Sequence, residues 1–366
     1  MKRSSSLLLS LCLTLGMLST AAQATEWHNP IDSAAVARGV DNIHGRGFCL
    51  NNYTRLPESA HGIIRDAVWG LAQNSAGLYL EFTTNSPELT VRYEVTGGHA
   101  MPHMPATGVS GVDLYNERGQ RCWGSYSFGT PITYSYKQLP DSTQGCRYTL
   151  YLPLYNTVRK LEIGVRDGSS FAFIPADKSA KPIVIYGTSI AQGACASRPG
   201  MAWSNLLHRQ TGQPIVNLGF SGNGRLEREV IDYIVQIPAS LYIVDCMPNM
   251  DFTEDSIYTL VLNTVHQIRE SHPQTPILLT EHPGYANRET NAYERNQDAL
   301  RDRAQRKAYA QLQKEGVKGL HYLSREELGM PADALVDIIH PSDYGMEIYA
   351  RAHARKVAKI LKLKLH

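Results

Sequence analysis

The sequence predicts an α/β protein. We expect a flavodoxin-like, three-layer C-terminal domain with a five-stranded parallel sheet, and an N-terminal β-sandwich of the jelly-roll type. Before about residue 180, apolar side chains recur with a period of two and turn residues separate short segments, which is typical of antiparallel sheets. After residue 181, short apolar runs alternate with long helical patterns, as in a doubly wound sheet. These two observations predict domains at residues 25–180 and 181–366.

Residues 1–24 have the pattern of a secretory signal peptide. Lys2 and Arg3 precede a short apolar run, Leu7–Leu18, and an A-x-A cleavage motif ends at Ala24. This order of a basic start, an apolar core and small residues predicts export and cleavage near Ala24. We therefore expect a periplasmic or secreted protein. The apolar run is too short to span a bilayer, so we expect no membrane insertion.

The charge balance argues against a nucleic-acid partner. The chain carries 36 Lys and Arg against 34 Asp and Glu, and removal of Lys2 and Arg3 leaves the two counts equal. Binding to a phosphate backbone needs clustered basic residues, and the sequence has no such run. A small molecule or a glycan ester is the expected partner.

Five cysteines follow the signal peptide, and export permits disulfides. A bridge between Cys122 and Cys146 is predicted if their strands are neighbours. Cys195 and Cys246 are either a second bridge or two small buried thiols. No cysteine or histidine spacing typical of a zinc site occurs, so no metal or cofactor is expected.

The N-terminal half contains a clear strand pair pattern. Leu78, Leu80 and Phe82 alternate with polar residues, and the same alternation resumes at 89–95 after an Asn-Ser-Pro turn. We expect these two segments to pair antiparallel with one buried face. Further strands are predicted at 111–115, 148–152 and 161–165.

Two features of this half have both structural and functional interpretations. Its many Tyr and Trp residues are typical of a buried core, or alternatively of a carbohydrate-binding module. The stretch His99–Met104 combines His and Met, which can bind copper. Since no carboxylate, cysteine or repeat accompanies it, we interpret it as a loop near the domain interface.

The C-terminal half alternates strands and helices. Strands are expected at 182–186, 214–219, 241–246, 276–280 and 320–323, and helices at 201–211, 226–237, 256–271, 290–315 and 344–361. In open sheets of this kind, ligands bind beyond the carboxyl ends of the strands. Ser189 follows the first strand, Gly219 ends the second and Asn249 follows the third. Asp337 and His340 precede the last helix.

These strand-end residues have the chemistry of acyl transfer. Ser189 would attack an ester carbonyl, His340 would accept the hydroxyl proton, and Asp337 would hold the imidazole. The Ser189 N–H, the Gly219 N–H and the Asn249 amide are candidate donors to the oxyanion. Each residue also has a structural interpretation, as a helix cap or a turn former. Asp343 is an alternative acid, although a cap of the last helix is the favoured role.

At these residues the chain resembles the SGNH (GDSL-type) hydrolases, in the secreted subgroup whose N-terminal β-sandwich carries a G-x-D-L-Y motif. This motif occupies residues 111–115 here. In the second half, the resemblance lies in the segments 186–190, 196–200, 219–223, 245–250 and 337–341. The resemblance implies Ser189 as nucleophile, Gly219 and Asn249 as oxyanion donors, and Asp337 with His340 as the acid–base pair. Thr188 replaces the usual Asp, and Pro-Asn-Met at 248–250 replaces the usual Gly-x-Asn-Asp block.

The leading functional hypothesis is a serine esterase that removes small acyl groups, by analogy O-acetyl groups, from carbohydrates. Two alternatives stay open. The first is an acyl hydrolase for lipids or thioesters, although no broad apolar lid is evident. The second is a glycan-binding protein with an inactive site.

Overall fold

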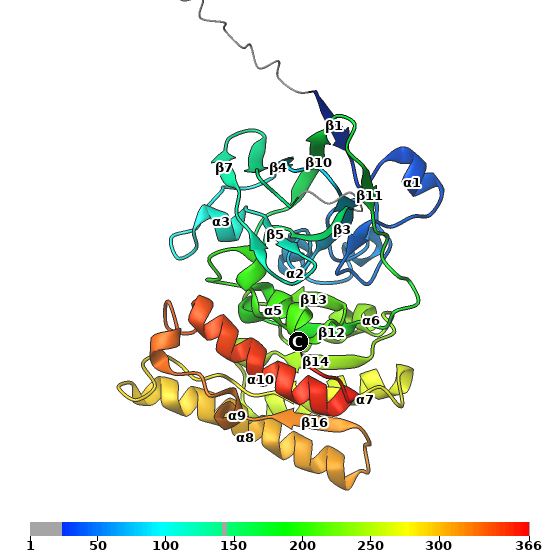
Figure 1. The fold of residues 1–366 in the computed structure, drawn as a ribbon. Coiled ribbons are helices and arrows are strands. Elements are labelled where there is room, and N and C mark those ends of the chain that lie inside the picture. Colours follow the sequence, from blue (N-terminus) through cyan, green and yellow to red (C-terminus); the bar gives the residue numbers. More distant parts are fainter. Residues whose placement is uncertain (1–23, 141–144, 366) are drawn as a thin grey trace, which may run out of the picture.

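The computed structural model describes residues 24–140 and 145–365. The predicted signal peptide falls almost entirely within residues 1–23, outside the described part. Figure 1 shows two stacked units, a β-sandwich above and an α/β layer structure below. In the described part of the chain, no helix combines the length and apolar character needed to cross a bilayer.

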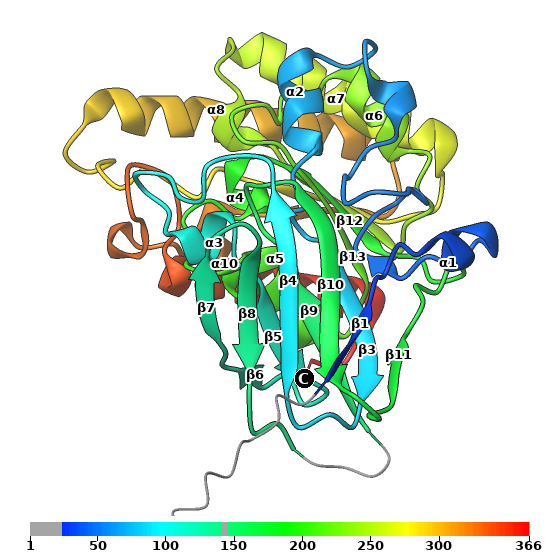
Figure 2. The same cartoon turned by 90° about the horizontal axis from the view of Figure 1, so that it is seen from above.

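The N-terminal unit consists of two antiparallel sheets. One sheet has the order β1 (Thr25–His28), β10 (Val158–Arg166), β4 (Leu89–Val95), β8 (Ile132–Tyr136) and β7 (Ser125–Phe128). The other has the order β11 (Phe171–Phe173), β3 (Tyr79–Thr84), β9 (Cys146–Tyr151), β5 (Asp113–Asn116) and β6 (Arg121–Cys122), with β2 (Ile43–His44) beside β3. Their inner faces share one apolar core, and Figure 2 shows the first sheet side by side in this order. The predicted sandwich is confirmed.

The predicted pairing of the segments around 80 and 92 is wrong. β3 and β4 lie in different sheets: β3 pairs with β9, and β4 pairs with β10 and β8. The turn between them takes the chain across the sandwich, held by hydrogen bonds from Ser86 N to Thr84 Oγ1 and from Ser86 Oγ to Glu88 O. Both strands do bury alternate side chains. A period of two therefore indicates the buried face of a strand but not its neighbour.

The C-terminal unit has a five-stranded parallel sheet of order β13 (Ile215–Gly219), β12 (Ile183–Gly187), β14 (Leu241–Asp245), β15 (Ile277–Thr280) and β16 (Leu320–Leu323). This is the predicted flavodoxin-like order. α5 (Trp203–Thr211) and α10 (Asp343–Leu361) cover one face, and α6 (Arg228–Ile234), α7 (Glu254–Ser271) and α8 (Ala292–Lys314) cover the other. The five predicted strands and the five long helices are all present.

Segments from the first half of the chain pack into the two cores of the C-terminal unit, whereas the sandwich has a core of its own. Three short helices come before the parallel sheet in the chain: α1 (Ser33–Ala37), α2 (Asp66–Ala72) and α3 (Ala106–Val109). Two more follow strands of this sheet, α4 (Ser189–Gln192) after β12 and α9 (Arg325–Leu328) after β16. Ile64 and Val68, beside and within α2, pack in the core under α6 to α8. Met104 and Val109 join the core under α5 and α10. Side chains from the first half of the chain therefore help to build both faces of the C-terminal sheet.

The G-x-D-L-Y motif also joins the two units. Asp113 Oδ2 accepts hydrogen bonds from Arg198 Nη1 at 2.6 Å and from Gly200 N at 2.9 Å. Tyr115 Oη accepts a second bond from Arg198 Nη1 at 2.5 Å. A Cβ at position 200 would lie 2.3 Å from Tyr115 Oη, so only glycine fits there. The motif therefore acts as an attachment point between the sandwich and the α/β unit.

The cysteines are not bridged. The five described cysteines are free thiols, so the predicted Cys122–Cys146 bridge is wrong. Their strands, β6 and β9, are not neighbours, because both pair with β5. Cys195 and Cys246 are buried, as in the alternative of two thiols. Cys246 Sγ lies 3.6 Å from Tyr186 O.

Candidate active site

Ser189 stands at the turn between β12 and α4. Gly187 ends the strand, and a Cβ there would lie 2.6 Å from the Ala191 side chain. Thr188 caps the helix, since its hydroxyl accepts a hydrogen bond from Ile190 N at 3.3 Å. Ser189 is then the first helical residue and is 5% exposed. The tight turn thus presents the serine at the carboxyl end of the sheet.

The loop before α10 presents His340. Asp337 Oδ1 accepts hydrogen bonds from Ile339 N at 2.9 Å and His340 N at 2.8 Å, which closes a compact turn. His340 Nε2 lies 2.8 Å from Ser189 Oγ, and its Nδ1 lies 2.7 Å from Asp337 Oδ2. The structure thus brings together the three residues predicted for catalysis.

The Asp337 carboxyl is held in its ionised form. Partial burial by itself would raise its pKa, but hydrogen bonds from the His340 ring and from two backbone N–H groups outweigh this effect and lower the pKa. An ionised carboxylate on Nδ1 favours the tautomer that leaves Nε2 free to accept the Ser189 proton.

Asp343 has neither of the roles considered for it. Ser342 caps α10, because its hydroxyl accepts a bond from Gly345 N. Asp343 is the first helical residue and binds Ser197, with Oδ1 2.8 Å from the backbone N and Oδ2 2.5 Å from Oγ. Its carboxylate therefore anchors the 195–198 segment to the start of α10.

The expected oxyanion donors differ in their availability. Asn249 Oδ1 accepts a bond from Gly224 N at 3.1 Å, and its Nδ2 makes no hydrogen bond within the described residues. The Ser189 N–H is likewise unbonded there. The Gly219 N–H, in contrast, is buried and donates to Asn217 Oδ1 at 2.9 Å. The structure thus argues against Gly219 as a donor.

Gly222 is a better candidate and was missed by sequence reasoning. It lies on the same loop, with a φ of +69°, and its N–H has no acceptor in the described part of the chain. This loop is joined to the turn that carries Ser189, because Phe220 N donates to Gly187 O at 3.0 Å. Both glycines belong to the Gly-Phe-Ser-Gly-Asn segment at 219–223. Only the structure tells them apart as donors, because it shows that the Gly219 N–H is already bonded to Asn217 Oδ1.

A buried arginine from the first half of the chain supports this loop. Arg55 is 1% exposed. Its guanidinium donates to Gly219 O at 2.7 Å and Asn217 O at 3.2 Å, as well as to Asn74 O and Leu71 O. Burial lowers the pKa of Arg55 to about 9, and among the described residues no carboxylate pairs with it. Sequence reasoning gave no signal for this residue.

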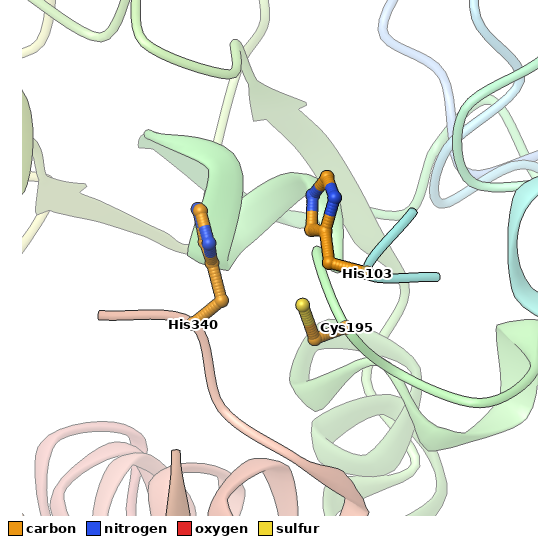
Figure 3. A group of neighbouring side chains, drawn as sticks. All are labelled: His103, Cys195 and His340. Carbon is orange, nitrogen blue, oxygen red and sulfur yellow. The ribbon is translucent and has the colours of Figure 1, made fainter. Parts of the chain in front are cut away.

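His103 also comes from the first half of the chain. It is exposed at the tip of a turn closed by two backbone bonds between Met101 and Met104. Its ring stacks near that of His340, with centroids 5.8 Å apart. Figure 3 shows the two rings side by side with the Cys195 sulfur beside the gap between them. The stretch 99–104 thus lies at the domain interface, as interpreted.

A large cavity lies elsewhere. It has a volume of about 1200 Å³ and is bounded by Pro182, Pro214 and Pro238, at the amino ends of three strands. Tyr79 and His208 also line it. Ser189 and His340 lie at the opposite edge of the sheet, so this cavity is separate from the candidate active site.

Two family models match this chain. The GDSL-like lipase/acylhydrolase family matches residues 180–358, and the N-terminus of SGNH hydrolase-type esterases, named GxDLY, matches residues 26–171. The chain therefore belongs to the SGNH (GDSL-type) hydrolases, and the fold is that of an esterase-type hydrolase. No protein of curated function matches the sequence.

Solved structures agree with this assignment. A Bacteroides ovatus ATCC 8483 protein described as a GDSL-like lipase is 29% identical, with a TM-score of 0.82 over 93% of this chain and 99% of its own. The salicylyl-acyltransferase SsfX3 of a tetracycline biosynthetic pathway is 23% identical, with a TM-score of 0.73 over 93% and 98%. A family two carbohydrate esterase from Cellvibrio japonicus is 13% identical, with a TM-score of 0.55 over 93% and 99%. The last two show the fold alone.

Proposed function

We propose that this protein is an exported serine esterase that hydrolyses small acyl esters, chiefly O-acetyl groups, of carbohydrates. The observation that carries the proposal is the 2.8 Å approach of His340 Nε2 to Ser189 Oγ, with Asp337 on the opposite nitrogen. The carbohydrate substrate is supported by structural neighbours described as carbohydrate esterases. Export is supported by the predicted signal peptide.

In the proposed reaction, Ser189 Oγ attacks the ester carbonyl while its proton passes to His340 Nε2. Asp337 stabilises the imidazolium through the Nδ1–H bond. Negative charge then develops on the carbonyl oxygen, and it is stabilised by hydrogen bonds from the Ser189 N–H, the Gly222 N–H and Asn249 Nδ2. His340 then gives its proton to the leaving alcohol, and a water molecule, activated by the same imidazole, releases the acid from Ser189.

A larger acyl group is the second candidate, and it rests on one observation. Val336 and Ile338, on both sides of Asp337, are 49% and 40% exposed, and Tyr344 is 62% exposed. These apolar side chains border the catalytic loop and would suit an acyl chain longer than acetyl.

The test is hydrolysis of p-nitrophenyl esters of increasing chain length, with acetylated oligosaccharides analysed by mass spectrometry. We expect acetate release from the glycans and the highest kcat/KM with the acetyl ester, both abolished in Ser189→Ala. Rates that rise with chain length would favour the lipid or thioester alternative. Glycan binding without turnover of any ester would favour the glycan-binding alternative.

A further inference from the structure

Beyond the proposed reaction, the geometry points to a cation site over the catalytic base. We propose that His103, Cys195 and His340 bind a thiophilic transition-metal cation such as Zn²⁺, and that the bound cation inhibits the esterase. One ligand atom of each residue lies within 4.8 Å of those of the other two. Figure 3 shows that the three side chains converge from three separate segments.

Each of the three segments is anchored. The turn that carries His103 is fixed by Met104, which is buried in the core that also contains Cys195. Cys195 has a left-handed φ of +68°, and the following segment is tied to α10 through the bonds between Ser197 and Asp343. His340 is held by Asp337. The convergence therefore belongs to the fold and does not depend on one mobile loop.

The donor set suits a borderline-soft cation. Two imidazole nitrogens and one thiolate are typical ligands of Zn²⁺, which binds nitrogen at about 2.0 Å and sulfur at about 2.3 Å. Tetrahedral ligation then requires ligand atoms about 3.5 Å apart, so the group must contract by roughly 1 Å. The His103 ring is exposed and makes no hydrogen bond within the described residues, so it can rotate inward.

A cation bound to His340 is expected to inhibit the esterase, because it would occupy the ring nitrogen that faces Ser189. Asp337 holds Nδ1, so a cation would bind Nε2 and displace its contact with Ser189 Oγ. A carboxylate on the other nitrogen is the usual support of a metal-bound imidazole. The Cys195 thiol loses its proton to solvent as the metal–sulfur bond forms. Once Nε2 is bound to a metal, it cannot accept the Ser189 proton, so catalysis stops. This consequence rests on the proposed function, whereas the binding site itself does not.

The first experiment measures Zn²⁺ inhibition of p-nitrophenyl acetate hydrolysis, each protein being compared with its own uninhibited rate. We expect inhibition that a chelator reverses. Cys195→Ala and His103→Ala should each raise the inhibitory Zn²⁺ concentration at least about tenfold. The matched controls are Cys49→Ala, an exposed thiol, and His99→Ala on the same loop, which should behave like the unmodified protein. Equal inhibition of all five proteins would overturn the proposal.

The second experiment does not need activity. Co²⁺ bound at the site should give a thiolate-to-metal charge-transfer band in the unmodified protein and in Ser189→Ala, and no such band in Cys195→Ala. His103→Ala should weaken Co²⁺ binding by a similar factor as for Zn²⁺. If the protein hydrolysed no ester but showed the band, the metal site would stand and the esterase proposal would fail. Absence of the band from the unmodified protein would overturn the metal site, whatever the esterase activity.

Discussion

Asp337 Oδ2 lies 2.7 Å from His340 Nδ1, while two backbone N–H groups hold the other carboxylate oxygen. The aspartate is thus fixed before it orients the imidazole. We expect Asp337→Asn to lower kcat by about 10³- to 10⁴-fold, because the amide favours the wrong tautomer of His340. Steady-state kinetics with p-nitrophenyl acetate measure this change. Asp333→Asn, an exposed position nearby, is the control, and an equal loss in both variants would contradict the assigned role.

Asn249 offers a test of the oxyanion site. Its Oδ1 is held by Gly224 N, so the amide is oriented with Nδ2 available. Asn249→Ala should lower kcat by about 10²- to 10³-fold with little change in KM, because the lost bond forms only in the transition state. A rise in KM at constant kcat would instead assign Asn249 to substrate binding.

Arg55 should contribute more to stability than any exposed arginine. Its guanidinium satisfies four carbonyl oxygens from the two halves of the chain. In Arg55→Met these oxygens lose their donors, and since each unsatisfied buried group costs about 1–3 kcal/mol, we expect a loss of at least about 3 kcal/mol. Urea unfolding measures it. Arg159→Met, at an exposed position, should lie within about 0.5 kcal/mol of the unmodified protein.

The attachment between Asp113 and Arg198 predicts a further loss of stability. Asp113 is buried, and its Oδ2 binds both Arg198 and Gly200. Asp113→Asn keeps the shape but removes the charge, leaving Arg198 half-buried with a weaker partner. We expect the free energy of unfolding, measured in urea, to fall by about 2–4 kcal/mol. Glu94→Gln, whose carboxylate pairs with the exposed Lys160, should change stability by less than about 1 kcal/mol. Equal losses in both variants would contradict the role of Asp113.

Sequence reasoning succeeded where one local rule decides the outcome. Parallel strands end at one edge of the sheet, so Ser189 and His340 were expected to be neighbours although 151 residues separate them. It failed where a residue or strand has its contacts in a distant part of the chain. Arg55 lies among turn-forming residues and has no apolar periodicity that would indicate burial. The pairing of β3 with β9 depends on a crossing between sheets, which alternation along one strand cannot reveal.

Asp245 offers a test of pH dependence. It is fully buried at the end of β14, opposite Gly187 of β12, and Tyr349 Oη donates to its Oδ1 at 2.7 Å. Burial raises its pKa from 3.8 to about 8, although the Tyr349 bond lowers it in part. The folded protein therefore keeps a proton that the unfolded chain releases above about pH 4.

The sign follows from this difference in bound protons. The stabilisation is complete below about pH 4 and is lost as pH rises towards 8, by up to about 1.4 kcal/mol per pH unit. Asp245→Asn has no proton to lose there, so the free energy of unfolding should fall more steeply with pH in the unmodified protein than in the variant. Urea unfolding between pH 5 and 8 measures both slopes, with Asp232→Asn, at an exposed position, as control. Parallel slopes would mean that Asp245 is ionised in the folded protein.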